Sequence, residues 1–438
     1  MIFSNNELMQ KDLEYIWHPC TQMKDHEKIP IIPVKYAKGV YLYDFDDNKY
    51  IDAVSSWWVN IFGHSNEYIN NKIKNQLDTL EHIILAGFTH KPAIDLAEKL
   101  VKITPNGLNK VFFADNGSSA IEIALKMSYH YHLNENSNRT LFLSLTNSYH
   151  GETIGALSVG DVELYKKTYK PLLINCIQTP VPKDQTVQAA KDALIALEEV
   201  LKQEGDNISA FIVEPLVQGA GGMHMYHEEY LIGARRLTQI YGIHLIVDEI
   251  MTGFGRTGKM FASEYAGIEP DFMTLSKGLT GGYLPLSVVM TTNKVYNAFY
   301  CDYSEYKAFL HSHSYTGNAL ACSAAIATLE LFEEQKIIDK NILINKYMKQ
   351  KLERFNGFKN VKSTRILGMI AVIELSDIDT KERVGVIISQ YALSRGVLLR
   401  PLGNTIYVMP PFVITNNEID TIFDVIYDAI DKLDFTLK

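Results

Sequence analysis

Apolar and polar residues follow two different patterns along the 438-residue chain. Near the N-terminus, residues 39–53 (GVYLYDFDDNKYIDA) alternate apolar and polar positions on both sides of Asp46-Asp47-Asn48, which predicts a β-hairpin. From about residue 95, short continuous apolar runs alternate with longer helical patterns. The apolar runs lie at 109–114, 139–145, 208–215, 243–249 and 271–276, and the helical patterns at 118–133, 186–203 and 228–242.

The continuous apolar runs indicate the fold class. Strands without polar alternation, separated by helices, are typical of a mostly parallel sheet covered on both faces, so we expect an α/β fold. Ligands of such sheets bind at the carboxyl ends of the strands. A helix-rich stretch from Asn318 leads to apolar runs at 368–375 and 396–411 and to a last amphipathic helix, which predicts a smaller α+β unit.

Two domains are expected, because 438 residues with 47% hydrophobic content exceed the size at which one core usually stops growing. The large domain is predicted at residues 65–325. The N-terminal segment 1–64, with its hairpin, and the C-terminal segment 326–438 are predicted to form the small domain together.

Charge and composition limit the class of partner. A formal net charge of −9 argues against a nucleic-acid backbone, because such binding depends on clustered Lys and Arg. No run approaches the ~20 apolar residues of a membrane span, and the first residues lack the pattern of a signal peptide. Four scattered cysteines without paired metal-ligand spacing fit a reducing compartment. We therefore expect a cytoplasmic protein that acts on small molecules.

Three strand ends carry residues that suit one cofactor. After the first apolar run, a turn at Gly117 and Ser118 opens a helix whose first N–H groups suit a phosphate; an ordinary turn with a Ser N-cap is the alternative. Asp248 ends the fourth run, where a poorly solvated carboxylate needs a cation or a strong donor; a structural ion pair, for example with Arg256, is the alternative. Lys277 follows the fifth run among glycines (TLSKGLTGG).

A phosphate anchor, a buried carboxylate and an amine are the three groups that pyridoxal 5′-phosphate requires from a protein. Asp248 would keep the pyridine nitrogen protonated. Lys277 would supply the amine for the aldehyde and act as a base on the substrate's Cα proton. Tyr149, at another strand end (TNSYHGET), is a candidate for stacking on the ring, although a tyrosine there is as often simple packing. The sequence thus predicts pyridoxal phosphate as the cofactor.

Other motifs are weaker. Residues 253–258 (GFGRTG) satisfy the G-x-G-x-x-G pattern, so a dinucleotide dehydrogenase is a rival. Two acidic residues directly precede these glycines, and the acidic residue expected about twenty positions later is missing, which argues against that rival. The histidines in MHMYHEEYL and LHSHSY lack a metal-binding spacing or a third ligand, so no metal is expected. A module that only binds the cofactor would make Lys277 dispensable, and no motif supports this.

These residues resemble a known family. Residues 247–258 (VDEIMTGFGRTG) followed by 274–282 (TLSKGLTGG) are similar to the signature of class III, or ω-, aminotransferases of fold type I. The resemblance extends from WHPCTQM through SSWW, NSYHGETIGALSV and EPLVQGAGGM to LLRPLGNTIYVMPP, and so covers nearly the whole chain. It implies a transaminase that forms a homodimer with its cofactor pockets at the subunit interface.

The resemblance also implies roles for individual residues. It implies that Lys277, Asp248 and Tyr149 are catalytic, and that the cofactor contacts Gly117, Ser118, Tyr149, Asp248, Lys277 and Ser314. It implies substrate contacts from Trp57, Tyr149, Glu152, Lys277, Ser312, Arg400 and Cys20. The planar fork of Arg400 suits a distal carboxylate, with a surface ion pair as the alternative, and Glu152 is nearly as easily explained as a solvated carboxylate. Trp57 and Trp58 would face opposite ways if extended, so at most one lines the pocket.

Two positions depart from the family's pattern. Cys20 stands where most members have a tyrosine, which removes an aromatic wall and a hydroxyl from the expected substrate pocket. Ser312-His313-Ser314 replaces a Gly-Pro-Thr turn, and Ser314 keeps a hydroxyl for the phosphate bound by the partner subunit. The amino donor stays open between S-adenosylmethionine and lysine. An ω-aminotransferase acting on an ornithine- or 4-aminobutyrate-like amine, or an aminomutase of the same fold, is the alternative function.

Overall fold

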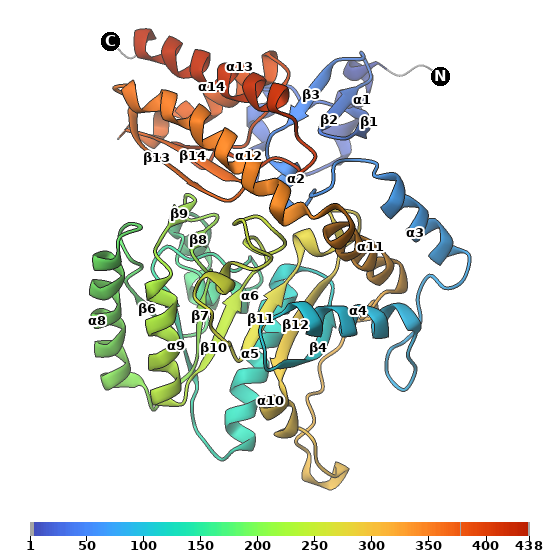
Figure 1. Ribbon diagram of the computed structural model, residues 1–438, viewed down its shortest axis with the longest axis vertical. Helices are drawn as coiled ribbons and strands as arrows, with labels where there is room; N and C mark the ends of the chain where they lie inside the picture. The colour runs from blue at the N-terminus through green and yellow to red at the C-terminus, as the bar shows by residue number, and fades with distance from the viewer. Residues whose placement is uncertain (1–3, 377, 437–438) are drawn as a thin grey trace. The chain divides into compact units, whose positions relative to one another are not determined.

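The computed structural model describes residues 4–376 and 378–436 of the chain (Figure 1). These residues form two compact units. The larger unit contains Tyr68–Leu343 and Leu367–Met369, and the smaller unit contains the residues up to Glu67, Ile344–Ile366 and the residues from Ile370 onward. Segments near both ends of the chain therefore contribute to the smaller unit. No helix within the described residues is long and apolar enough to cross a membrane.

A seven-stranded sheet forms the centre of the larger unit. The pairs β11–β10, β10–β7, β7–β5 and β5–β6 are parallel, and β12 is antiparallel to both of its neighbours. The predicted mostly parallel α/β sheet is confirmed. The strand order is β4 (Leu108–Ala114), β12 (Ser287–Thr292), β11 (Phe272–Leu275), β10 (His244–Asp248), β7 (Ile208–Val213), β5 (Leu141–Leu145) and β6 (Cys176–Thr179).

The antiparallel strand β12 was not among the predicted apolar runs. It follows β11 after residues 276–286, and the pairing of Leu275 with Val288 shows that the chain turns back directly. A parallel neighbour would need a longer crossover, usually one that contains a helix. The short return places Lys277 in a loop at the carboxyl end of β11.

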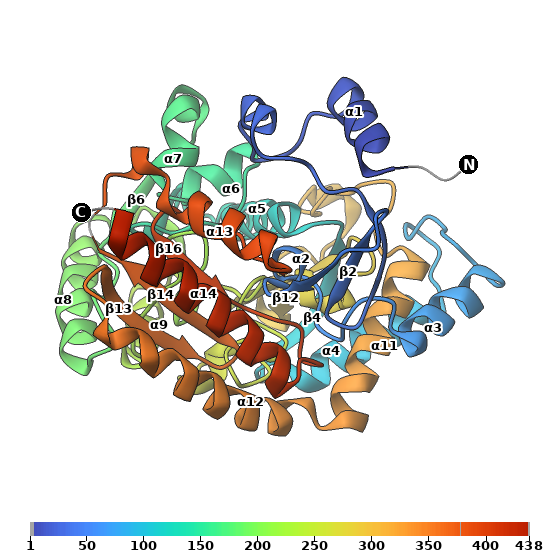
Figure 2. The ribbon, with the colours of Figure 1, turned by 90° about the horizontal axis from the view of Figure 1, so that it is seen from above.

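Helices cover both faces of the sheet, which explains the continuous apolar sequence of its strands. Figure 2 shows α5 (Gly117–Asn134) and α6 (Ile154–Val159) on one face, and α9 (Glu229–Tyr241) and α11 (Ala319–Gln335) on the other. The predicted helices at 118–133, 186–203 and 228–242 are confirmed as α5, α8 (Val187–Glu204) and α9. The core beneath α5 includes Ile121, Leu125, Phe142, Ile212, Ile246 and Phe272. The other α-helices between residues 67 and 318 are α3 (Glu67–Leu77), α4 (Lys91–Ile103), α7 (Glu163–Lys166) and α10 (Asn293–Asn297).

The smaller unit contains two sheets. The predicted N-terminal hairpin is confirmed, because β2 and β3 pair antiparallel on either side of residues 45–48. β15 pairs parallel to β3, so the C-terminal part of the chain extends the hairpin's sheet. The first sheet is β1 (Val34–Lys38), β2 (Tyr41–Asp44), β3 (Lys49–Asp52) and β15 (Val397–Leu398), and the second is β13 (Val361–Leu367), β14 (Ile370–Leu375) and β16 (Thr405–Val408). Its helices include α1 (Asn5–Tyr15), α2 (Ser55–Trp58), α13 (Val384–Ser394) and α14 (Asn416–Thr436), and α12 (Ile337–Leu352) begins in the larger unit.

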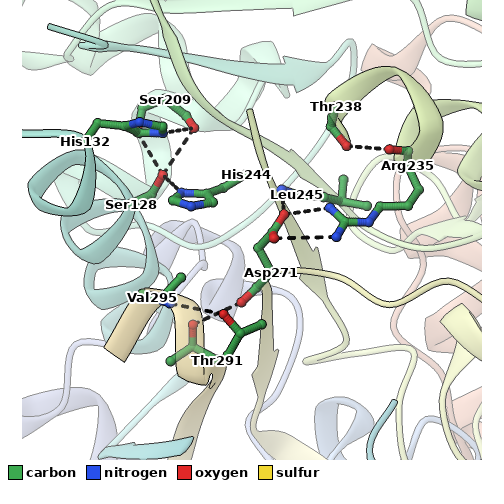
Figure 3. Close-up of polar contacts among 11 residues, drawn as sticks. Ser128, His132, Ser209, Arg235, Thr238, His244, Leu245, Asp271, Thr291 and Val295 are labelled. Carbon is green, nitrogen blue, oxygen red and sulfur yellow. Dashed lines mark hydrogen bonds and ion pairs between the residues drawn. The ribbon is translucent and has the colours of Figure 1, made fainter. Parts of the chain in front are cut away.

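A buried polar network lies at the amino ends of β7 and β10 (Figure 3). The hydroxyl of Ser128 on α5 bonds the hydroxyl of Ser209 and Nδ1 of His244, both at 2.8 Å. Nε2 of His132 donates to the carbonyl oxygen of Ser209 at 3.1 Å. Burial lowers the pKa of His132 to about 4 and that of His244 to about 3, so both imidazoles are neutral in the folded protein.

Asp271 joins three strands at the same edge of the sheet (Figure 3). Its carboxylate accepts hydrogen bonds from Nη1 of Arg235 at 2.6 Å and from the N–H of Leu245 at 2.8 Å. Its carbonyl oxygen accepts a hydrogen bond from the hydroxyl of Thr291 at 3.0 Å. These bonds connect β10, the start of β11 and β12, and they leave the opposite edge of the sheet for ligands.

Candidate active site

The carboxyl ends of five strands bring polar residues to one edge of the large sheet, where parallel sheets bind their ligands. Most of the residues predicted for the cofactor lie on these strand ends. Gly117 and Ser118 follow β4, Tyr149 and Glu152 follow β5, Glu214 follows β7, Asp248 ends β10, and Lys277 follows β11.

Lys277 begins the short helix η4 (Lys277–Thr280) in a left-handed conformation, with φ of 45°. The preceding residue is fixed, since the hydroxyl of Ser276 donates to the carbonyl oxygen of Leu286 at 2.9 Å. Burial lowers the pKa of Lys277 to about 8, while the charges of Asp248 and Glu214 oppose this decrease. An amine with such a pKa is partly neutral near neutral pH, as a nucleophile or base must be.

Asp248 is buried, and both oxygens of its carboxylate have hydrogen-bond partners. Its Oδ2 lies 2.7 Å from Nδ1 of His150, and its Oδ1 accepts hydrogen bonds from the N–H of Ile250 at 3.1 Å and the hydroxyl of Thr274 at 3.3 Å. Thr274 is also its register partner on β11. The carboxylate thus contacts the imidazole of His150, whose buried Nε2 has no hydrogen-bond partner within the described residues. The sequence analysis overlooked His150, although it directly follows Tyr149.

The loop after β5 is joined to the start of α5. The hydroxyl of Tyr149 donates to Oε1 of Glu152 at 3.1 Å, and the N–H of Glu152 donates to the hydroxyl of Ser118 at 3.3 Å. Gly151 between them has φ of 130°, and a Cβ there would lie 2.0 Å from that hydroxyl, so only glycine permits this approach. The ring of Tyr149 also packs edge-on against Tyr165, with ring centroids 5.4 Å apart.

The start of α5 differs in one detail from the expected turn. The N-cap is Asn116 and not a serine: its side chain accepts a hydrogen bond from the N–H of Ser119 at 3.0 Å. Its carbonyl oxygen accepts a hydrogen bond from the hydroxyl of Ser287 at 2.7 Å. An Asn cap therefore leaves Ser118 to bond the neighbouring loop. The helix begins at Gly117 and runs for 18 residues, so its first turn offers N–H groups and a positive dipole end for an anion.

Glu214 is a further site residue that the sequence analysis missed. It is buried, and its carboxylate accepts hydrogen bonds from the N–H groups of Tyr149 at 2.9 Å and Gly219 at 2.8 Å. The signal was present in the sequence, because Glu214 lies near the end of an apolar run, as Asp248 does.

Three predicted substrate residues meet in the smaller unit. The guanidinium carbon of Arg400 lies 4.1 Å from the ring centroid of Trp57, a cation–π contact. Nη2 of Arg400 donates to the carbonyl oxygen of Cys20 at 3.3 Å, and Cys20 is exposed with φ of 50°. Trp57 remains 40% exposed, so its indole can contact a ligand.

The sequence analysis considered an extended segment for Trp57 and Trp58, but the structure does not have one. Residues 55–58 form a left-handed turn, with φ values of 52°, 46°, 70° and 76°. The buried carboxylate of Asp52 holds this turn, since it accepts hydrogen bonds from the N–H and the hydroxyl of Ser56 at 2.9 and 2.7 Å. Trp58 is buried, and its Nε1 donates to the hydroxyl of Tyr407 at 2.9 Å, so Trp58 packs in the core.

Ser312 and Ser314 are exposed, and within the described residues neither hydroxyl makes a hydrogen bond. The carbonyl oxygen of Ser314 accepts a hydrogen bond from Nε2 of His82 at 2.6 Å. The turn that contains His313 is closed by Thr316, whose hydroxyl donates to the carbonyl oxygen of His313 at 2.8 Å. Thr316 therefore stabilises this turn without proline.

The described part of the chain also contains no group of three or more His, Cys, Asp and Glu side chains arranged to hold a metal ion.

Comparison with known proteins identifies the class. Residues 21–430 match the family model of the class-III aminotransferases. The chain belongs to this family, and it is an aminotransferase.

Relatives resemble the chain over its whole length. It is 53% identical over 441 residues to an adenosylmethionine-8-amino-7-oxononanoate aminotransferase of Helicobacter pylori, with 99% of each chain covered. A protein of the same name from Aquifex aeolicus is 43% identical, with 97% of each chain covered. The crystal structure of the Methanocaldococcus jannaschii protein of that name matches with a TM-score of 0.94 and 38% identity, covering 98% of this chain and 99% of that one.

Proposed function

We propose that this aminotransferase uses pyridoxal 5′-phosphate to transfer an amino group from S-adenosylmethionine to 8-amino-7-oxononanoate, which yields the 7,8-diaminononanoate used in biotin biosynthesis. The names of its full-length relatives support the substrates. One observation carries the site: Asp248 and Lys277 lie at the ends of the adjacent parallel strands β10 and β11, where Asp248 pairs with Thr274 in register.

The residues present fit this cofactor. The start of α5 at Gly117 and Ser118 suits its phosphate, and Asp248, oriented by His150, suits its pyridine nitrogen. The buried Nε2 of His150, which lacks a partner within the described residues, supports a polar group nearby. When bound, pyridoxal phosphate accepts the amino group and delocalises the electrons left at the substrate's Cα.

The chain's own residues supply the remaining steps. The partly neutral amine of Lys277 would hold the cofactor through its aldehyde and would take up the proton from the substrate's Cα. The carboxylate of Asp248 would keep the pyridine nitrogen protonated, and the ring of Tyr149 would contact the cofactor's ring.

The substrate contacts are proposed from the smaller unit and from the edge of the sheet. Arg400, stacked on Trp57, binds the carboxylate of the oxo acid in the plane of its guanidinium group. Trp57 lines the path of the substrate's alkyl chain. Cys20, Glu152 and Ser312 are proposed as further substrate contacts.

A homodimer is proposed for the assembly, with Ser314 reaching the phosphate bound by the partner subunit. Exposed apolar side chains along 296–315 support it, because such a surface on a monomer would stay in contact with water. These side chains are Tyr296, Tyr300, Tyr303, Tyr306, Leu310 and Tyr315. A cytoplasmic location stays a prediction.

Replacing the lysine tests the proposal. The purified protein is reconstituted with pyridoxal phosphate, and the visible absorbance and the turnover of Lys277→Ala are compared with those of the native protein. We expect both to be lost, because the substitution removes the amine that would bind the cofactor's aldehyde. Lys259→Ala is the control, since Lys259 donates to the carbonyl oxygen of Glu264 and has no proposed role. Turnover retained by Lys277→Ala would contradict the assignment.

A half-reaction identifies the donor. S-adenosylmethionine or lysine is added to the cofactor-loaded protein, and the loss of visible absorbance is followed. We expect S-adenosylmethionine to bleach the protein and 8-amino-7-oxononanoate to restore the colour. Bleaching by lysine alone would assign the donor to lysine.

A further inference from the structure

Glu214 is a second buried carboxylate on the cofactor edge, and it has no role in the steps above. It is 4% exposed and directly follows β7. Its two oxygens bond different loops: Oε2 accepts from the N–H of Tyr149 at 2.9 Å, and Oε1 accepts from the N–H of Gly219 at 2.8 Å. A buried carboxylate held by two backbone donors fixes both segments in place, because breaking either bond would leave a buried polar group unpaired.

The first of these segments carries two residues of the proposed site. Tyr149 is the candidate stacking ring, and His150, the next residue, places Nδ1 2.7 Å from Oδ2 of Asp248. The position of the imidazole therefore depends on a backbone that Glu214 holds. A continuous chain of contacts runs from Glu214 through the Tyr149–His150 backbone to Asp248.

Glu214 also belongs to a cluster of titratable groups. His150, Asp248 and Lys277 interact with it electrostatically, and the hydroxyl of Tyr226 donates to its carbonyl oxygen at 2.6 Å. Burial raises the pKa of Glu214 to about 7, and the charge of its carboxylate opposes the decrease that burial causes in the pKa of Lys277.

We propose that Glu214 is a positioning residue of the cofactor pocket: it holds the Tyr149–His150 backbone so that the imidazole meets Asp248, and its charge stabilises the protonated amine of Lys277. This inference rests on the proposed function, which uses Tyr149, Asp248 and Lys277 but assigns nothing to Glu214.

The chain offers a matched control in Glu249. This carboxylate is also buried, and burial raises its pKa to about 7 as well. It accepts hydrogen bonds from the N–H groups of Ala262 at 3.0 Å and Ser263 at 2.7 Å. These donors belong to η3 (Ala262–Tyr265) and not to the loop of Tyr149. Glu249 is also absent from the charges that act on Lys277.

The charge is tested in the protein without cofactor. The pH midpoint of the Lys277 amine is measured by labelling with a small acylating reagent and quantifying the modified peptide by mass spectrometry. For Glu214→Gln we expect a midpoint lower by roughly one pH unit, because a nearby negative charge favours the protonated amine. Glu249→Gln should keep the native midpoint. An unchanged midpoint in Glu214→Gln, or an equal shift in both variants, overturns the proposal.

The positioning is tested separately by Glu214→Asp, which keeps the charge and shortens the side chain by one carbon. We expect a nearly native Lys277 midpoint but a dissociation constant for pyridoxal phosphate about 3–10-fold higher, because a hydrogen bond that holds Tyr149 is lost. If Glu214→Asp binds pyridoxal phosphate with the same dissociation constant as the native protein, the positioning role is overturned. This test does not depend on whether Glu214→Gln folds. Failure of the native protein to bind pyridoxal phosphate would contradict the proposed function instead, so the two outcomes are distinct.

Discussion

Arg400 is held on two sides, and these contacts limit how an anion can approach it. The guanidinium carbon lies over the indole of Trp57, 4.1 Å from the ring centroid, and Nη2 donates to the carbonyl oxygen of Cys20. A carboxylate approaches in the plane of the group, where paired N–H donors can meet both of its oxygens.

Arg400→Ala should raise the KM for 8-amino-7-oxononanoate about 10–100-fold, because a charge-assisted hydrogen bond contributes about 1.5–3 kcal/mol. The change in kcat should be smaller, since the carboxylate is distant from the reacting carbon. Steady-state kinetics with varied oxo acid check this. Arg395→Ala is the matched control, because Arg395 stacks on Tyr391 in the same unit at 5.4 Å. An unchanged KM would remove Arg400 from the substrate pocket.

Sequence patterns identify some site residues and conceal others for a physical reason. Lys277 and Asp248 stand out because each lies at the end of an apolar strand, and Glu214 lies at the end of another. The role of Glu214 depends on backbone donors from Tyr149 and Gly219, which no spacing in the sequence reveals. The pairing of His150 with Asp248 likewise joins residues 98 positions apart.

At the scale of elements, the parallel strands and their covering helices were predictable, because burial on both faces leaves a continuous apolar sequence. The antiparallel strand β12 was not, since its direction follows from the short return after β11 and not from its composition. The left-handed turn at residues 55–58 was also hidden, because hydrogen bonds to Asp52 and not local preference determine it.

The network of α5, β7 and β10 predicts how stability depends on pH. The folded protein keeps His132 and His244 neutral, with pKa values of about 4 and 3, whereas free imidazoles titrate near ~6.5. Below that pH the unfolded chain binds protons that the folded chain does not, so stability should fall as the pH decreases toward 4. Each histidine contributes about 1.4 kcal/mol per pH unit in this range.

His132→Gln should make this pH dependence shallower. Glutamine can still donate to the carbonyl oxygen of Ser209, but it does not titrate. Urea unfolding at pH 7 and at pH 5 measures the free energy of unfolding of both proteins. The same loss of stability in native protein and variant would show that the network does not control acid unfolding.

At the scale of the whole molecule, the exposed aromatic side chains of residues 296–315 predict the assembly. Leu310→Asp should weaken the homodimer, because Leu310 is 92% exposed and a charge there would be buried between subunits. Light scattering over a range of protein concentrations measures the dissociation. Cofactor affinity should fall together with dimer content, since Ser314 is proposed to reach the partner's phosphate.

Ile240→Asp is the matched control for that experiment. Ile240 lies on α9 and is 66% exposed, so it is a comparable apolar side chain outside the segment 296–315. It should leave the assembly unchanged. A Leu310→Asp protein that remains dimeric at all concentrations would place the interface elsewhere.

The left-handed turn at residues 55–58 changes the expected effect on stability of replacing an aromatic residue by glycine. Each of its residues has a positive φ, a conformation that costs an L-amino acid about 1–2 kcal/mol and glycine almost nothing. Glycine at position 57 would therefore relieve backbone strain while it empties the volume of the indole. Replacing Trp57 by glycine to admit larger substrates should therefore lower the melting temperature less than replacing a tryptophan on a β-strand by glycine.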